Sequence, residues 1–283
     1  MINEKIHLKN YFSDILDKET DPVVELFLQH NTSEVNRGGQ KRPAMIICPG
    51  GGYSFCSERE SEPIALQFLS EGYNAFIINY STEPFAFPTQ LREIAALMEL
   101  IYQNQDEWNV DVNKIIIIGF SAGGHLAAHY ANAYNCPEVR EVFPDSKGVN
   151  GCILCYPVIS SDEIYWHKSS FENLIGKKDP TQDELERFSI NKLVTKDTPP
   201  TFIWHTAEDN AVPVGNSILY ASVLSKNNVP FELHIYPYGA HGLSTSDAQV
   251  LECERSKMEC NMYNHNWLEQ AKRWLKLMNF TNK

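Results

Sequence analysis

Residues 119–127 read GFSAGGHLA, and they surround one serine with small residues at the end of the apolar run KIIIIG at 114–119. Gly119, Ser121 and Gly123 complete the pattern G-x-S-x-G. This pattern gains meaning when a strand turns sharply into a helix and raises the serine hydroxyl above the sheet. Glycines let the backbone pass closely beneath the serine. The stretch therefore predicts a strand, a tight turn and a helix, with Ser121 as a candidate nucleophile.

Short apolar runs alternate with helical patterns along the rest of the chain. Strands are expected at 22–30, 42–50, 73–81, 149–157, 200–206 and 231–237. Helices are expected at 58–72, 91–102, 214–228 and 261–279. In the second of these, apolar residues recur at three- and four-residue steps, which indicates one buried helix face. Because strands and helices alternate, we expect an α/β fold with a mostly parallel sheet.

Residues 157–200 depart from this alternation. They are polar and aromatic, with short helical patterns at 170–176 and 181–194. Either they form a cap-like insertion over the mouth of the sheet, or they are an ordinary long connection with helices of its own. No internal repeat or Gly/Ser linker divides the chain, so we expect one domain over residues 1–283.

A serine hydroxyl becomes nucleophilic only when a base takes its proton and an acid orients that base. In a strand–turn–helix arrangement of this kind the chain order is serine, acid, histidine. Asp209 follows the apolar strand in FIWHTAEDNAVP (202–213), and His241 follows the next strand in HIYPYGAHGLS (234–244). We therefore predict Asp209 as the acid and His241 as the base.

Other residues compete for these two roles. Glu208 adjoins Asp209 and is the alternative acid. Among the nine histidines, His205 lies within an expected strand, and His125 and His129 lie on the helix after the serine. We expect a structural or surface role for each of these three histidines, whereas the predicted base lies in a turn between Gly239 and Gly242.

A tetrahedral intermediate needs fixed N–H donors for its oxyanion, commonly from the residue after the nucleophile and from a glycine loop after an early strand. The stretch ICPGGGYSF (47–55) is such a loop. Ala122, Gly51 and Gly52 are the candidate donors. A tight Pro-Gly turn explains one or two glycines but not three, and the stretch lacks the Gly-Lys-Ser/Thr of a phosphate-binding loop.

Composition narrows the classes of partner. The 283 residues are 43% hydrophobic and 21% charged, as in an ordinary globular protein, and the formal net charge is −12. Binding to a phosphate backbone requires clustered Lys and Arg, so we expect no nucleic-acid partner. The apolar runs fall far short of the roughly 20 residues that span a bilayer, so we expect no membrane partner either.

The cysteines and the first residues bear on the cellular compartment. Seven scattered cysteines show no spacing of a disulfide framework. Cys152 and Cys155 form a C-x-x-C, but residues three apart on a strand point to opposite faces, which argues against a redox or metal pair. The first twenty residues mix charges and lack the apolar core of a secretion signal. We expect a cytoplasmic protein.

Several of these segments together resemble the α/β-hydrolase superfamily, and their combination is similar to its small carboxylesterase branch, which includes acetylxylan-esterase-like and feruloyl-esterase-like proteins. The resemblance rests on PGGGYSF, EPIALQFLSEGYNAFIINYS, GFSAGGHLA, HTAEDNAVPV and YPYGAHGLS. It implies an α/β-hydrolase fold, with helices on both faces of a mostly parallel central sheet. It also implies a nucleophile, an acid, a base and an oxyanion hole at Ser121, Asp209, His241 and the amides of Gly51, Gly52 and Ala122.

The resemblance has one departure. Related loops often read His-Gly-Gly-Gly, whereas Pro49 stands at the place of that histidine. Hydrogen bonds behind the oxyanion hole must then come from elsewhere, and the choice among Gly51, Gly52 and Tyr53 as donors stays open.

The expected function is a serine esterase for short acyl esters such as acetylated sugars, with no metal and no organic cofactor. Tyr53 and Trp166 are expected in the pocket wall. An arylformamidase, a lactonase or a peptidase-type hydrolase would use the same residues, because geometry and not the fold selects the substrate. A hydrolase-fold binding protein without catalysis is the alternative from another class.

Overall fold

A computed structural model describes residues 1–32, 34–35, 39–250 and 262–282. Its centre is one eight-stranded sheet with the strand order β1-β2-β4-β3-β5-β6-β7-β8. The strands are β1 (Ile2–His7), β2 (Val23–Leu28), β3 (Arg42–Cys48), β4 (Asn74–Asn79), β5 (Val110–Phe120), β6 (Gly151–Cys155), β7 (Thr201–Thr206) and β8 (Phe231–Tyr236). From β4 to β8 every neighbouring pair is parallel, and β2 is antiparallel to both of its neighbours. The expected mostly parallel sheet is confirmed.

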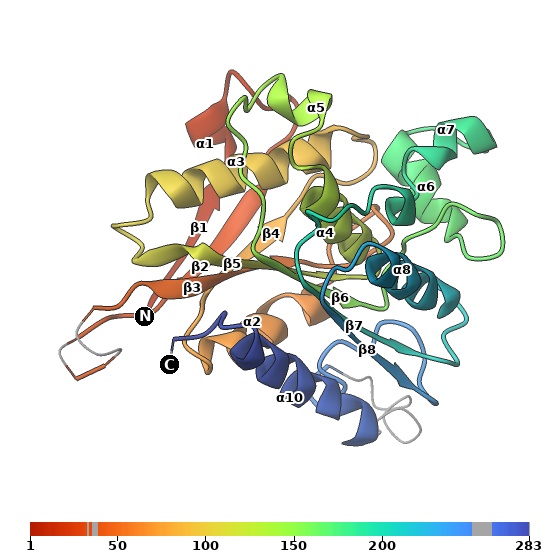
Figure 1. The fold of residues 1–283 in the computed structure, drawn as a ribbon. Helices are drawn as coiled ribbons and strands as arrows, with labels where there is room; N and C mark the ends of the chain where they lie inside the picture. The colour runs from red at the N-terminus through yellow and green to blue at the C-terminus, as the bar shows by residue number, and fades with distance from the viewer. Residues whose placement is uncertain (33, 36–38, 251–261, 283) are drawn as a thin grey trace.

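Helices cover both faces of the sheet (Figure 1). On one face lie α1 (Lys9–Phe12), α3 (Thr89–Gln103), α4 (Ser121–Ala133), α5 (Pro137–Arg140) and α8 (Gly215–Lys226). On the other face lie α2 (Glu62–Leu69) and α10 (Met262–Leu277). The apolar side chains form two buried clusters, one on each side, because strands buried on both faces alternate their side chains between them. None of the described helices is long and apolar enough to cross a membrane.

The turn between β5 and α4 depends on the absence of side chains at two glycines. A Cβ at Gly119 would lie 2.2 Å from the carbonyl oxygen of Gly123. A Cβ at Gly123 would lie 2.2 Å from the carbonyl oxygens of Cys48 and Pro49, at the end of β3. The small residues around Ser121 therefore let α4 begin directly against β3, and they place the serine at the carboxyl edge of the sheet.

Residues 157–200 contain α6 (Lys168–Ile175), α7 (Gln182–Glu186) and a 3₁₀ turn at Ile190–Lys192. Both predicted short helical segments are therefore helical in part. In Figure 1, α6 and α7 lie at the upper right, to one side of the helices that cover the sheet. Asn173 of α6 donates a hydrogen bond to the carbonyl oxygen of Gly52, at 2.9 Å. The segment thus contacts the glycine loop.

The first strand and the two cysteines of the C-x-x-C can also be compared with what the sequence led us to expect. Strand β1 was not expected, since its residues INEKIH are almost all exposed and have no buried alternation; its backbone pairs with β2 at the edge of the sheet. Cys152 and Cys155 are both buried in β6, and they belong to the apolar clusters on opposite sides of the sheet. Their side chains therefore point to opposite faces of the sheet, as expected for residues three apart on a strand.

Candidate active site

Three side chains from distant parts of the chain form a continuous hydrogen-bonded line. His241 Nε2 lies 2.8 Å from Ser121 Oγ, and His241 Nδ1 lies 2.6 Å from Asp209 Oδ2. A carboxylate only accepts hydrogen bonds, so Nδ1 carries the imidazole hydrogen and Nε2 is free to accept from the serine hydroxyl. This is the arrangement in which a histidine can take the proton of a serine.

The sheet topology accounts for the convergence. Ser121 follows β5, Asp209 follows β7 and His241 follows β8, and these strands are parallel members of one sheet. Residues after parallel strands meet at one edge of the sheet, which is where ligands bind in open α/β folds. Ser121 has a φ of +53°, a left-handed conformation that L-residues rarely adopt, and its surroundings hold it there.

The carboxylate of Asp209 is buried, and each of its two oxygens accepts two hydrogen bonds. Its Oδ1 accepts hydrogen bonds from the amides of Ala211 and Val212, at 3.0 and 2.8 Å. Its Oδ2 accepts from His241 and, at 3.2 Å, from His205 Nε2. Burial acts to raise the pKa of Asp209, but the hydrogen bonds from His205, His241 and Val212 outweigh it and hold this pKa below its ordinary range. The group stays a carboxylate.

The competing residues lie elsewhere. Glu208 is exposed and accepts a hydrogen bond from the amide of Gly239, at 3.3 Å, instead of approaching the imidazole of His241. His125 is buried between the Tyr53 hydroxyl and the Phe188 carbonyl oxygen, and burial lowers its pKa to about 4.

Two other histidines on the same side of the sheet are also enclosed. His129 stacks on Phe87, and burial lowers its pKa to about 3. His205 bonds Ser217, Val212 and the carboxylate of Asp209, so its place is structural but adjoins the hydrogen-bonded line of Ser121, His241 and Asp209.

The glycine loop after β3 has two amides with no internal partner. Gly51 and Gly52 have φ values of +131° and +65°, and a Cβ at Gly51 would lie 2.0 Å from the carbonyl oxygen of Phe55. Among the described residues, neither amide donates a hydrogen bond. Ala122 lies in the first turn of α4, where amides have no acceptor within the helix. All three are therefore free to receive an oxyanion.

Residues other than a histidine form hydrogen bonds with the backbone of this glycine loop. The hydroxyl of Tyr80 donates to the carbonyl oxygen of Pro49, at 2.7 Å. The amide of Gly50 donates to the Glu60 carboxylate, also at 2.7 Å. The question raised by Pro49 thus has a structural answer: a tyrosine and a buried glutamate hold the loop from behind.

A cavity of about 260 Å³ opens above Ser121. Its walls come from the glycine loop, the 3₁₀ turn that follows it, the start of α6 and the loop of His241. The lining residues are Gly51, Gly52, Ser54, Phe55, Ser57, Arg59, Glu60, Ser121, His167, Ser169, His241 and Gly242. Most of these residues are polar, and Phe55 is an aromatic side chain with 60% exposure.

The two residues expected in the pocket wall lie outside this lining. Tyr53 is 1% exposed, and its hydroxyl donates to His125 Nδ1 at 2.8 Å, so its ring supports the glycine loop from inside. Trp166 is half-buried against the apolar core, with the Lys168 ammonium 6.0 Å from its ring. Its neighbour His167 lines the cavity instead.

Sequence reasoning missed several residues of this site, including Glu60, Tyr156, His167 and His205. Glu60 lies against the glycine loop, Tyr156 lies against the imidazole of His241, and His167 lines the cavity. His205, for which a structural or surface role was expected, bonds the carboxylate of Asp209. Glu60 lies in a stretch that reads as a helix start, and Tyr156 directly follows a strand. No spacing in the sequence connects either residue to Ser121.

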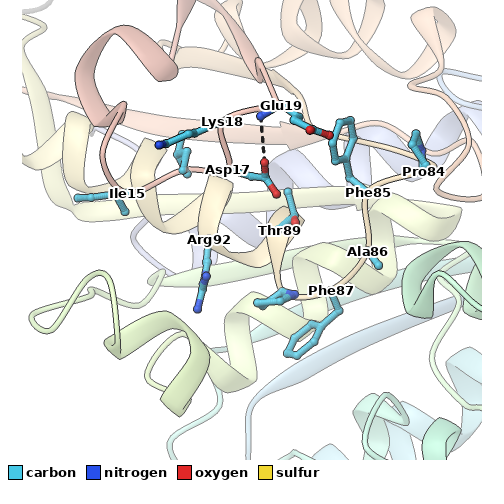
Figure 2. A pocket seen from close by; sticks show the side chains of 12 residues that line it. Ile15, Asp17, Lys18, Glu19, Pro84, Phe85, Ala86, Phe87, Thr89 and Arg92 are labelled. Carbon is cyan, nitrogen blue, oxygen red and sulfur yellow. Dashed lines mark hydrogen bonds between the residues drawn. The ribbon is translucent and has the colours of Figure 1, made fainter.

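A larger cavity of about 810 Å³ lies away from Ser121, between segments 15–19 and 84–92 (Figure 2). Its walls contain charged, aromatic and proline side chains but no serine, cysteine or histidine. The charged groups are partly engaged, as in the bond from the Glu19 amide to Asp17 that Figure 2 shows. Among the described residues, no three metal-binding side chains converge here or elsewhere. Ser121 and His241 line the smaller cavity.

Comparison with known proteins shows the family to which the chain belongs. The BD-FAE family model matches residues 34–224, more than half of the chain. The endo-1,4-beta-xylanase B of Butyrivibrio fibrisolvens is 39% identical over 216 residues, which are 73% of this chain and 33% of that protein. The acetylxylan esterase of Xylanibacter ruminicola is 33% identical over 205 residues, 70% of this chain and 40% of that protein. The chain thus spans between a third and two fifths of the length of these curated relatives.

A solved structure matches over nearly the whole length of both chains. The acetyl ester-xyloside bifunctional hydrolase from Caldicellulosiruptor lactoaceticus superposes with a TM-score of 0.83 at 33% sequence identity, over 99% of this chain and 97% of that one. The α/β-hydrolase fold is therefore confirmed. The chain belongs to the BD-FAE family of α/β hydrolases, and the proteins it is similar to include an acetylxylan esterase and a carboxylesterase.

Proposed function

We propose that the chain hydrolyses short acyl esters, acetyl esters of sugars above all, through an acyl-enzyme on Ser121. The observation that carries this proposal is the placement of one imidazole within hydrogen-bond distance of both Ser121 Oγ, at 2.8 Å, and Asp209 Oδ2, at 2.6 Å. With Asp209 held as a carboxylate, His241 has the tautomer and the orientation of a general base.

In the first half-reaction, Ser121 Oγ attacks the ester carbonyl carbon while His241 Nε2 takes the hydroxyl proton. The carbonyl oxygen becomes an oxyanion, and the amides of Gly51, Gly52 and Ala122 are the donors placed to stabilise it. When the intermediate collapses, the bond from carbon to the alcohol oxygen breaks and His241 returns its proton to the alcohol. The acyl group stays on Ser121.

In the second half-reaction, His241 takes a proton from water and the resulting hydroxide equivalent attacks the acyl carbon. The new oxyanion uses the same three amides. When this second intermediate collapses, the bond between the acyl carbon and Ser121 Oγ breaks, and the carboxylic acid is released. Ser121 Oγ regains its proton from His241. No group outside the chain and water is required for atoms and charges to balance.

The walls of the cavity support a small acyl group and a hydroxylated alcohol. A cavity of about 260 Å³ offers little room for a long acyl chain. Serines, His167 and Arg59 supply hydrogen-bond groups for sugar hydroxyls, and the exposed ring of Phe55 offers a face for a sugar ring. The names of two similar proteins, an acetylxylan esterase and an acetyl ester-xyloside hydrolase, favour the same class of alcohol.

Residues 157–200 have a part in this proposal. His167 and Ser169 line the cavity, and Asn173 bonds the carbonyl oxygen of Gly52. We infer that this segment is a cap that contributes one wall of the alcohol site and steadies the glycine loop.

The test compares the wild type with Ser121→Ala and with Ser70→Ala, which changes an exposed serine at the end of α2. We expect Ser121→Ala to lose turnover of 4-nitrophenyl acetate by about 10⁴-fold or more, because the nucleophile is absent. Ser70→Ala should retain it. A fluorophosphonate should label the wild type at Ser121. Acetate should be released from acetylated xylo-oligosaccharides, and 4-nitrophenyl acetate should be cleaved faster than 4-nitrophenyl butyrate, because the cavity is small.

Each part of the proposal has its own contrary result. Turnover in Ser121→Ala equal to the wild type would exclude the acyl-enzyme. Efficient cleavage of an arylformamide, a lactone or a peptide, with weak ester cleavage, would replace the ester by another substrate. Failure of the fluorophosphonate to label folded protein would favour a binding protein.

A further inference from the structure

The mechanism proposed above leaves one buried acid beside the reaction centre unused. Glu60 is 3% exposed and lines the cavity that contains Ser121 and His241. Burying a carboxylate is costly unless hydrogen bonds compensate. The position of Glu60 therefore requires an account of what it contacts.

Each carboxylate oxygen of Glu60 accepts a hydrogen bond from a different wall of the site. Oε2 accepts from the amide of Gly50, at 2.7 Å, in the loop that continues into Gly51 and Gly52. Oε1 accepts from the hydroxyl of Tyr156, at 2.7 Å, directly after β6. Since an ionised carboxylate has only acceptors, both partners must donate, and the two bonds define the direction of each donor.

The second bond continues to the loop of the base. The Tyr156 oxygen accepts a hydrogen bond from the amide of Ser244, at 2.9 Å, three residues after His241. The Tyr156 ring also meets the imidazole of His241 edge to face, with the ring centroids 5.0 Å apart. Glu60 is thus linked on one side to the glycine loop and on the other to the loop that carries His241.

Packing leaves this carboxylate little freedom. A Cβ at Gly50 would lie 2.7 Å from Glu60 Oε2 and 3.0 Å from the Cβ of Ser121. The glutamate, the glycine loop and the nucleophile therefore meet at one point. Burial raises the pKa of Glu60, while the bonds from Tyr156 and Gly50 oppose this rise by favouring the carboxylate.

We propose that Glu60 is a positioning residue for the esterase reaction, because it holds the oxyanion-binding loop and the His241 loop in their relative places through Gly50 and Tyr156. This inference rests on the proposed function. Glu60 takes over the support that the loop lacks at Pro49, and it adds a link to the base. Misplacement of reacting groups by about 1 Å can cost about 10²-fold in rate, so the loss of such a link has a measurable kinetic effect.

The experiment compares Glu60→Gln with a matched control, Glu93→Gln. Glu93 is also a fully buried glutamate with two accepted hydrogen bonds, but both come from Ser81, and it does not line the catalytic cavity. In Glu60→Gln the side-chain amide cannot accept one of the two bonds. We expect kcat for 4-nitrophenyl acetate to fall by about 10-fold to 100-fold with KM within twofold of the wild type, whereas Glu93→Gln should retain kcat even if its Tm falls.

Two further measurements separate positioning from a structural role. Tyr156→Phe removes the bond to Glu60 and the link to Ser244 but leaves the bond between Glu60 and Gly50, so kcat should fall in this variant as well. A boronic acid that forms a tetrahedral adduct with the serine should bind Glu60→Gln more weakly by about the factor lost in kcat/KM. If Glu60→Gln does not fold, the kcat of Tyr156→Phe tests the inference instead. A Tyr156→Phe variant with the kcat of the wild type would overturn it.

The contrary results are distinct from those of the proposed function. If the wild type cleaves esters and a folded Glu60→Gln variant has the same kcat, the inference is overturned but the proposed function is not. Equal losses of kcat in Glu60→Gln and Glu93→Gln overturn it as well, because they indicate a general effect on stability. A wild type that cleaves no ester removes both the proposed function and the inference.

Discussion

His205 Nε2 lies 3.2 Å from Asp209 Oδ2 within the core, so the carboxylate that bonds His241 is held by a second imidazole. The same Nε2 lies 3.0 Å from the carbonyl oxygen of Val212, which only accepts hydrogen bonds. Nε2 therefore carries the hydrogen, and the Nδ1 of His205 accepts from the hydroxyl of Ser217 at 2.8 Å. His205 is thus a donor that orients the carboxylate toward His241.

Replacing this donor should weaken both catalysis and stability. In His205→Phe the Asp209 carboxylate and the Ser217 hydroxyl lose a partner in the core, which we expect to cost about 1–3 kcal/mol of stability and to lower kcat/KM for 4-nitrophenyl acetate. His234→Phe is the matched control, since His234 is half-buried on β8 and bonds Glu232. Kinetics and thermal melting of both variants measure the effect. Wild-type kcat/KM in His205→Phe would contradict the orienting role.

Acid should reduce the stability that Asp209 contributes. The hydrogen bonds that it accepts hold its folded pKa below the ordinary range, so this pKa is lower than in the unfolded chain. A group of this kind stabilises the fold above its unfolded pKa of about 3.9, and the contribution is lost as the pH falls toward the folded pKa. Asp209→Asn has no titrating carboxyl at this position.

The gap in Tm between the wild type and Asp209→Asn should therefore be largest near pH 7 and should narrow between about pH 5 and pH 2. Thermal melting followed by circular dichroism over this range measures it. A gap that stays constant with pH would mean that the carboxylate is not linked to folding in this way. The kinetic control is the same variant at pH 7, where we expect a loss of kcat, because the amide can no longer favour the correct tautomer of His241.

Phe55 should affect sugar esters more than simple esters. Its ring is 60% exposed at the cavity above Ser121. We expect Phe55→Ala to raise KM for acetylated xylo-oligosaccharides by about fivefold or more, the equivalent of about 1 kcal/mol of lost ring contact, with little change for 4-nitrophenyl acetate. Tyr11→Ala, which removes a ring that is 53% exposed on α1, is the control. Equal effects on both substrates would place the sugar elsewhere.

The turn before α4 should not tolerate a methyl group. In Gly123→Ala the added Cβ would meet the carbonyl oxygens of Cys48 and Pro49 at 2.2 Å, and backbone cannot move aside as a flexible side chain does. We expect a loss of folded protein or a fall in stability of more than about 3 kcal/mol. Gly39→Ala, at a φ of +111° with no atom within 4 Å of the added Cβ, tests backbone strain alone. Its stability should fall by about 1–2 kcal/mol, and similar losses in the two variants would contradict the steric argument.

The fold and the three central residues could be predicted because their signals are local. Each of Ser121, Asp209 and His241 follows an apolar run that forms a strand, and parallel strands bring the residues after them to one edge. The glycine loop also has a local signal, because its three glycines are consecutive and directly follow a strand. Strand β1 had no such signal, because an exposed edge strand is stabilised by backbone pairing with β2 and needs no apolar face.

The surroundings of these residues could not be predicted. Tyr53 follows the glycines directly, yet the turn sends its ring inward to His125 and not into the cavity, where the start of α6 supplies His167 instead. The Glu60 carboxylate receives bonds from Gly50 and from Tyr156, which is 96 positions away.

By itself the sequence determined the order of the strands from β2 to β8, the sharp turn at Ser121 and the candidate acid and base, since periodicity and turn chemistry depend on neighbouring residues. Only the tertiary structure decided which buried groups hold them in place. Hydrogen bonds between Glu60, Tyr156 and Ser244, or between His205 and Asp209, depend on how loops from separate strands pack at one edge of the sheet. Such contacts follow from distances in space, which spacing along the chain does not encode.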